Sequence, residues 1–187
     1  MADNIQITLD LLGERQTSRR IQTLRADLSD PRPAYRDIAD MIRKVQLPQF
    51  GTQGARGPRG RWVDLSEAYA TWKEMHYPGR PILVLTGKMK AAATSKQSPG
   101  AIEEIDRGGV TVGIDGDEVP YAMTHQHGDL GRNIPQRQVY DMTDGDQQEI
   151  VDIVRRHLLD SARRAGLTVD AVGESELSHI REIMGAV

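Results

Sequence analysis

Residues 101–114 have the sequence AIEEIDRGGVTVGI, and this stretch decides the fold class. In residues 110–114 (VTVGI) branched apolar side chains alternate with small or polar ones, which is the period of a half-buried strand. The Arg-Gly-Gly of residues 107–109 separates them from the short segment 101–106, and glycines suit a tight turn. The stretch therefore predicts an antiparallel β-hairpin.

The sequence after the hairpin predicts little more sheet. Residues 115–117 (Asp-Gly-Asp) turn the chain again. Residues 138–142 (QVYDM) are compatible with one further strand, which could join the same sheet. We therefore expect a small antiparallel sheet built around the hairpin.

Helical patterns precede the hairpin. Residues 5–28 repeat apolar side chains at spacings of three and four around a polar centre, 14–20, that we expect to be solvated or to face another chain. A second pattern follows Pro33 and should end at Pro48, because proline removes a helical hydrogen bond. A third helix should start after Asp64, which can cap it, and should be closed by Tyr77-Pro78-Gly79.

The clearest helix follows the hairpin. It starts at Thr143, where Thr-x-x-Asp resembles a capping box, and should end near Gly166 and pack across the sheet. The expected fold class is α+β: a small antiparallel sheet with a β-hairpin, flanked by N-terminal helices and by this long amphipathic helix. We expect one domain over residues 1–166. Residues 167–187 should form a C-terminal extension that wraps a neighbour or is poorly ordered alone.

Composition excludes several function classes. The 187 residues contain no cysteine, which excludes disulfides, thiolate metal sites and a cysteine nucleophile. The net charge of -3 gives no general attraction to nucleic acid or to an anionic membrane. No apolar run approaches the length of a membrane helix, and no signal peptide is recognisable, so we expect a protein made in the cytosol without a membrane partner.

Residues 51–61 form a distinct segment, with glycines at every third position and three arginines, Arg56, Arg59 and Arg61, but no acidic residue. The three-residue period is far too short for a collagen helix. A flexible loop is one interpretation, because glycine favours conformational freedom. The alternative is that the three guanidinium groups bind DNA phosphate or an acidic neighbour when a particle assembles.

The common catalytic motifs are absent from the sequence. Gly87-Lys88 lacks the flanking residues of a phosphate-binding loop, and neither a nucleophile elbow nor a dinucleotide fingerprint occurs. His125, His127 and Asp129 could in principle hold zinc or iron in a metal-dependent hydrolase. Histidines two residues apart share a face only on a strand, however, and the segment starting at Pro120 favours a short helix or turn. We therefore expect no cofactor and no catalysis.

Five short motifs follow one another in an order that resembles a known family, although each alone is weak. They are Trp62-x-x-Leu65-Ser66-x-x-Tyr69-x-x-x-Lys73, Ile82-Leu83 leading to Thr86-Gly87-x-Met89, Tyr121-Ala122-x-x-His125-Gln126-x-Gly128, Ile134-Pro135-x-Arg137, and the helix from Asp146. Together they resemble the virion morphogenesis, or tail completion, family of Mu-like phages over roughly residues 5–160. The sequence departs from the family pattern at His127, at residues 138–140 and after Gly166.

The resemblance implies a non-enzymatic subunit of a homo-oligomeric, sixfold ring at the phage head-tail joint, made in the cytoplasm of the bacterial host. Its expected partners are other copies of itself, adjoining connector and tail proteins, and genomic DNA in the lumen. Thr86-Gly87 should form a sharp turn. The residues expected to contact partners are Trp62, Tyr69, Tyr121, His125, Gln126, Pro135 and Arg137. For Trp62 and Tyr69 a packing role in the core is the alternative, because aromatic residues at helical spacing usually pack internally.

Overall fold

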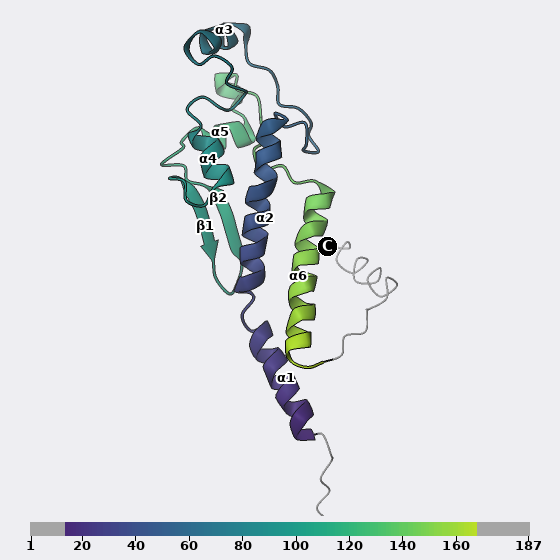
Figure 1. Ribbon diagram of the computed structural model, residues 1–187. Coiled ribbons are helices and arrows are strands. Elements are labelled where there is room, and N and C mark those ends of the chain that lie inside the picture. Colours follow the sequence, from purple (N-terminus) through teal and green to yellow (C-terminus); the bar gives the residue numbers. More distant parts are fainter. Residues whose placement is uncertain (1–13, 168–187) are drawn as a thin grey trace, which may run out of the picture. The chain divides into compact units, whose positions relative to one another are not determined.

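The computed structural model describes residues 14–167 of the chain (Figure 1). The chain divides into two compact units, one of Arg32–Val154 and one of Met1–Pro31 with Arg155–Val187. The helices are α1 (Glu14–Leu28), α2 (Arg32–Gly51), α3 (Glu67–His76), α4 (Lys88–Thr94), α5 (Ala122–His127) and α6 (Asp144–Arg164), with a short 3-10 turn at Leu130–Arg132. None of the helices in the described residues is long and apolar enough to cross a membrane.

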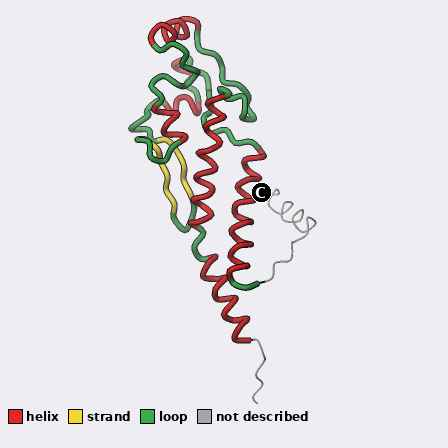
Figure 2. Tube along the Cα trace, viewed as in Figure 1, coloured by secondary structure: helices red, strands yellow, loops and turns green. Residues whose placement is uncertain are grey.

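The predicted hairpin is confirmed, and with it the α+β fold class. Strands β1 (Ala101–Ile105) and β2 (Val110–Ile114) pair antiparallel, with Ile105 opposite Val110 next to the turn. The Asp106 carboxylate closes the turn, because its Oδ1 accepts from the backbone N–H groups of Gly108 at 2.6 Å and Gly109 at 2.9 Å. Figure 2 shows the hairpin as the only ribbon of paired strands in the described part of the chain.

The prediction of a strand at residues 138–142 is wrong. Side chains form hydrogen bonds with backbone groups of this segment that a strand would use to pair with its neighbour. The carbonyl oxygen of Gln138 accepts from the Trp62 indole N–H at 2.8 Å and from the Gln49 amide at 3.1 Å. The amide oxygen of Gln126 accepts from the N–H groups of Val139 and Tyr140 at 2.9 and 3.2 Å. The segment is therefore held without a sheet partner.

Helix α2 continues beyond the proline that was expected to end it. Pro48 lies inside the helix, which extends to Gly51. In the last turn proline removes a single helical hydrogen bond, and tertiary contacts outweigh that loss here. The side chains of Gln49 and Phe50 are almost fully buried, and the Gln49 amide donates to the carbonyl of Gln138.

Two apolar clusters form the core of the Arg32–Val154 unit. One joins Phe50 of α2 and Met89 of α4 with Trp62, Val119 and Val139 from the connecting segments. The other lies along the opposite end of α2, where Ala34, Ile38, Met41 and Val45 pack with Ile153 of α6. Helices α2 and α4 contact both strands directly. The expectation that α6 itself packs across the sheet is therefore wrong: its Ile153 joins the cluster on α2 instead.

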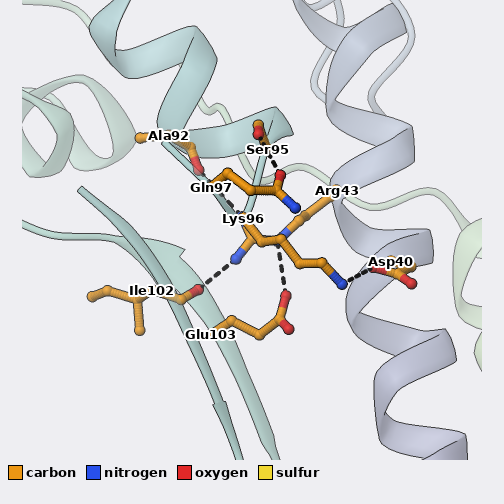
Figure 3. A network of polar contacts seen from close by, with 8 residues as sticks. All are labelled: Asp40, Arg43, Ala92, Ser95, Lys96, Gln97, Ile102 and Glu103. Atoms are coloured by element: carbon orange, nitrogen blue, oxygen red, sulfur yellow. Dashed lines mark hydrogen bonds and ion pairs between the residues drawn. The ribbon is translucent and has the colours of Figure 1, made fainter. Parts of the chain in front are cut away.

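Arg43 of α2 ties the helices to the hairpin from a buried position (Figure 3). Its Nε donates to Oε2 of Glu103 on β1 at 3.1 Å. Its Nη2 and Nη1 donate to the carbonyl oxygens of Ile102 at 2.8 Å and Ala92 at 3.2 Å. One guanidinium therefore satisfies groups on α4 and β1 that face α2, which fixes the three elements together.

The Gly/Arg segment consists of consecutive turns after α2. The N–H of Gly54 donates to the Gln49 carbonyl at 2.9 Å, and that of Gly57 donates to the Gly54 carbonyl at 2.9 Å. Two glycines are required for close packing: a Cβ at Gly54 would overlap the Trp62 indole, and one at Gly57 would overlap the Asp141 carboxylate. The expected loop is present, and its flexibility stays a prediction.

The second unit is described over residues 14–31 and 155–167. Where the structure describes the polar centre of α1, over residues 16–19, its side chains are exposed, as the sequence predicts. Arg164 donates through Nε to the Asp27 carboxylate at 2.8 Å. The parts of the predicted first helix before residue 14, and the predicted extension beyond residue 167, lie outside the described residues.

Candidate functional site

A groove of about 1200 Å³ lies in the Arg32–Val154 unit, and most of the predicted contact residues line it. Its walls come from three segments, 63–73, 83–89 and 118–137. We call it the motif groove, because each of these segments carries one or more of the sequence motifs. The predicted contact residues that line it are Tyr69, Tyr121, His125, Pro135 and Arg137. Trp62 and Gln126 do not line it.

Two glycines give the groove its local geometry. Gly87 has φ +89° and starts α4, which confirms the sharp turn predicted at Thr86-Gly87. Gly128 ends α5 with φ +78°, and an added Cβ there would lie 3.0 Å from the backbone nitrogen of Gln136. This close approach lets the N–H of Arg137 donate to the His125 carbonyl at 2.8 Å. The helix α5 and the Pro135 segment therefore form one wall of the motif groove.

Two buried cations line the motif groove, and neither makes an ion pair within residues 14–167. Arg137 is 5% exposed and donates to the carbonyl oxygens of Val63 at 2.8 Å and Asp64 at 3.0 Å. Lys73 is 4% exposed, and its Nζ donates to the Pro81 carbonyl at 2.6 Å. Burial lowers the pKa of both groups, against smaller opposing effects of Asp64 on Arg137 and of Glu74 on Lys73. The hydrogen bonds given above for the two cations therefore go to neutral carbonyl oxygens, while the carboxylates of Asp64 and Glu74 act on them only from beyond ion-pair distance.

His125 lies next to these cations. Its ring packs edge-on against Tyr121 with centroids 6.2 Å apart, and its Nδ1 is buried without a hydrogen-bond partner among the described residues. Burial lowers the His125 pKa, and the positive charge of Arg137 lowers it further. The neutral imidazole is therefore the favoured form, and it adds an apolar surface to the groove.

An exposed group of aromatic rings continues from the edge of the groove along α3. Trp72 stacks on Tyr69 and on His76, with ring centroids 5.5 and 4.8 Å apart, and Tyr77 lies 6.0 Å from it. Tyr69 is 42% exposed and Trp72 is 39% exposed. Leu130, which also lines the groove, is 99% exposed. Exposed aromatic and aliphatic side chains of this kind are common at protein interfaces, so a contact role for this surface stays a prediction.

Comparison with known protein families matches residues 13–159 to the phage virion morphogenesis family. The chain belongs to the phage virion morphogenesis family. The match includes all five sequence motifs, and thus all three walls of the groove, while residues 160–187 lie outside it. No curated protein and no solved structure matches the chain. The family gives the protein a structural or assembly role in the phage virion.

Two predicted contact residues of this virion protein have internal roles in the structure. Trp62 is buried in the core, where it packs edge-on against Phe50 at 5.5 Å and donates to the Gln138 carbonyl. Trp62 is therefore a core packing residue, as the alternative interpretation predicts, and it is not an exposed contact residue. Gln126 holds residues 139 and 140 in place through its amide oxygen. Tyr69, in contrast, is exposed, and its contact role stays a prediction.

The histidine constellation is not assembled in this virion protein. His125 and His127 belong to α5, where a spacing of two places side chains on nearly opposite faces. The Asp129 carboxylate accepts from the Arg132 guanidinium at 2.6 Å and from the Arg132 backbone N–H at 3.0 Å. Within residues 14–167 no group of three potential ligands is placed to hold a metal ion. The geometry gives the hydrolase alternative no support.

The three arginines of the Gly/Arg segment already have partners within the chain. Arg56 forms an ion pair with Asp146. Arg59 donates to the Gln136 side chain at 3.1 Å, and Arg61 lies 3.4 Å from the Asp64 carboxylate. Contact of Arg56 with DNA phosphate would require breaking a largely buried ion pair, so this residue serves the fold first. The exposed pairs of Arg59 and Arg61 cost little to exchange.

Sequence reasoning missed Lys73 and Leu130 as site residues. Lys73 closes the Tyr69-x-x-x-Lys73 motif, and its spacing of four from Tyr69 places both on one face of α3. That spacing is a usable signal. Leu130 carries none, because a single leucine between glycines has no periodic context.

Proposed function

We propose that this chain is a structural subunit of the head-tail joint of a tailed phage, and that it works by forming a homo-oligomeric ring between the capsid connector and the tail. Membership of the phage virion morphogenesis family supports the assembly role. The observation that carries the contact mechanism is the motif groove, because five predicted contact residues from separate motifs line one apolar surface.

The surface chemistry suits protein contact better than catalysis. Tryptophan, tyrosine and arginine are the residues that most often carry the binding free energy at protein interfaces. Here Trp72 and Tyr69 are exposed beside the groove, and Arg137 lies buried within it. The unit thus presents a concave site next to a protruding aromatic surface.

Such a pair of surfaces supports ring closure. A ring with cyclic symmetry uses a heterologous interface, in which one patch of each subunit binds a different patch of the next. Many modest contacts then add up around the ring. The expected sixfold symmetry derives from the family resemblance and is part of the proposal.

The test uses the full-length chain and the phage that encodes it. Native mass spectrometry of the purified chain and of disassembled particles should give one closed oligomer of defined mass. Particles produced without the protein should accumulate as DNA-filled heads separated from tails. A chain that stays monomeric at all concentrations, together with normally joined particles in its absence, would overturn the proposal.

A further inference from the structure

The motif groove contains two buried cations that make no ion pair within residues 14–167. Lys73 and Arg137 are both at least nine-tenths buried, both line the groove, and both are bonded to carbonyl oxygens without a carboxylate. Among the acidic side chains of the lining, that of Asp64 lies next to Arg61 at the exposed rim. A buried cation gains most from a carboxylate that arrives together with apolar groups that exclude water.

We propose that the motif groove of each copy binds the C-terminal segment of a neighbouring copy, residues 168–187. This inference rests on the proposed self-assembly and names the segment that makes the contact. The apolar residues Leu177, Ile180 and Met184 pack against the apolar walls of the groove. The acidic residues between and before them lie near Lys73, Lys88 and Arg137.

Charge complementarity supports this occupant. The segment TVDAVGESELSHIREIMGAV contains four acidic residues, Asp170, Glu174, Glu176 and Glu182, against one arginine. The groove has the opposite balance, because four basic residues line it against two acidic ones: Lys73, Lys88, Arg132 and Arg137 against Asp64 and Glu118. Of these cations, Lys88 is exposed and makes no ion pair within the described residues, so it is free to bind a carboxylate of the segment.

The apolar pattern of the segment matches the groove as well. Leu177, Ile180 and Met184 recur at spacings of three and four, which is the pattern of a helix that lays one face in a groove. On the groove side Leu130, Tyr69 and Tyr121 offer exposed apolar surface. DNA is a poorer occupant, because phosphate binding uses exposed cations and most of the groove wall is apolar.

The segment is also long enough to reach an adjacent copy. The nine residues that precede Leu177, residues 168–176, span about 30 Å when extended, which is about the diameter of a small domain. Each copy supplies one segment and one groove, so the contact between neighbouring copies is heterologous. Repeated around a closed rotation axis, this one interface is enough to form a ring.

The absence of cysteine makes a direct cross-linking test possible. One batch of full-length protein carries Leu130→Cys in the groove wall, and a second carries Ser178→Cys in the segment. Mixing the two batches under mild oxidation should give a covalent dimer, because a disulfide forms only when the two Cα atoms lie within about 7 Å. The matched control replaces Leu130→Cys by Gln147→Cys, at an exposed position of α6 outside the groove.

Cross-linking equal to that of the control overturns the inference. A chain that carries both cysteines is also diluted in unsubstituted protein. A disulfide that forms only within this single chain overturns the inference as well, because the segment would then bind the groove of its own copy. Capture of Leu130→Cys protein by an acidic segment of a different virion protein, in particles, also overturns it in favour of that partner.

A charge-reversal series provides a second readout on the full-length chain. Glu174→Lys with Glu176→Lys should raise the concentration needed for half-assembly about fivefold, as expected for two partly exposed ion pairs. Adding Lys88→Glu should restore part of that loss. Glu149→Lys with Glu104→Lys, both exposed and outside the groove, is the matched control and should leave assembly unchanged.

These outcomes separate the inference from the proposed function. Normal rings formed by the Glu174/Glu176 variant, without the specific cross-link, overturn the docking of the segment and leave the ring subunit intact. A wild-type chain that forms no oligomer in solution or in particles overturns both. The specific cross-link with a loss of assembly that Lys88→Glu rescues establishes both.

Discussion

The guanidinium of Arg56 forms an ion pair with the carboxylate of Asp146, which is also the residue that completes the N-terminal cap of α6. Thr143 and Asp146 exchange hydrogen bonds: the Thr143 N–H donates to Asp146 Oδ2 at 2.8 Å, and the Asp146 N–H donates to Thr143 Oγ1 at 3.2 Å. This is the capping box that the Thr-x-x-Asp pattern predicts. The Gly/Arg segment is therefore bound to the start of the long helix.

We predict that Asp146→Ala lowers the free energy of unfolding by about 2–4 kcal/mol. The substitution removes a helix cap and leaves the Arg56 guanidinium without its counter-charge in a largely buried site. Urea denaturation followed by circular dichroism measures the change. Asp144→Ala, which removes an exposed acidic residue of the same first turn of α6, is the control and should cost less than about 1 kcal/mol. Equal losses in the two variants would contradict the role of the ion pair.

The same residue predicts a pH dependence of stability. Burial of Asp146 by itself raises its pKa, but the hydrogen bonds from Arg56 and Thr143 together outweigh this effect, so that the pKa lies below its ordinary value of 3.8. A depressed folded-state pKa contributes stability above the unfolded-state pKa, and this contribution is lost as the pH falls through the folded-state pKa. The stability difference between the wild type and Asp146→Asn should be constant above about pH 5 and shrink below about pH 4. A difference that grows on acidification would refute this sign.

Gly57 is predicted to tolerate no side chain. A Cβ at this position would overlap the Asp141 carboxylate, whose Oδ2 also accepts from the Arg59 N–H at 3.2 Å. Gly57→Ala should therefore lower the free energy of unfolding by about 1–3 kcal/mol. Gly51→Ala is the matched control, because nothing lies within 4 Å of its Cβ position at the end of α2. It should be neutral or stabilising by up to about 1 kcal/mol.

Arg43 is predicted to be the most costly basic residue to remove from α2. Arg43→Met keeps much of the side-chain volume but leaves the Glu103 carboxylate and the carbonyls of Ile102 and Ala92 without their donor. The expected loss is about 3 kcal/mol or more, measured by thermal and urea unfolding. Lys44→Met, the exposed neighbour on the same helix, should change stability by no more than about 0.5 kcal/mol. A comparable loss in Lys44→Met would show that the apolar substitution itself is harmful.

The correct sequence predictions of structure depend on local interactions. The Asp106 turn and the capping box at Thr143 are formed by residues within three positions of one another, so a short motif contains the whole interaction. Two of the errors depend on partners that are distant in the sequence. Pro48 fails to end α2, and residues 138–142 form no strand, because Gln49 and Trp62 bind the Gln138 carbonyl across 89 and 76 positions of sequence. No local pattern contains such pairs.

The candidate site also combines features that a short motif predicts with features that depend on residues distant in the sequence. The motifs that carry the family resemblance supplied the predicted contact residues, and five of these residues line one groove. Spacing along α3 could have added Lys73. The burial of Trp62 could not be decided, because helical spacing gives the same pattern for a core residue and a contact residue. The burial of Arg137 against carbonyl groups became visible only when distant segments were placed together.

The last prediction concerns Trp72, the centre of the exposed aromatic group on α3. Trp72 stacks between Tyr69 and His76, and none of these three residues belongs to the two core clusters. Removal of the Trp72 side chain should therefore affect assembly more than folding. We expect Trp72→Ala to raise the concentration for half-assembly at least about tenfold, as for a residue of an interface hot spot. Its melting temperature should stay within about 4 °C of the wild type. Sedimentation velocity and thermal unfolding of the same preparation separate the two effects. Met75→Ala, an even more exposed apolar residue on the same helix outside the stack, is the control and should assemble normally. If Trp72→Ala assembles like the wild type, the aromatic group is not part of the interface. Trp72 would then behave as Met75 is expected to, as an exposed apolar residue without a partner.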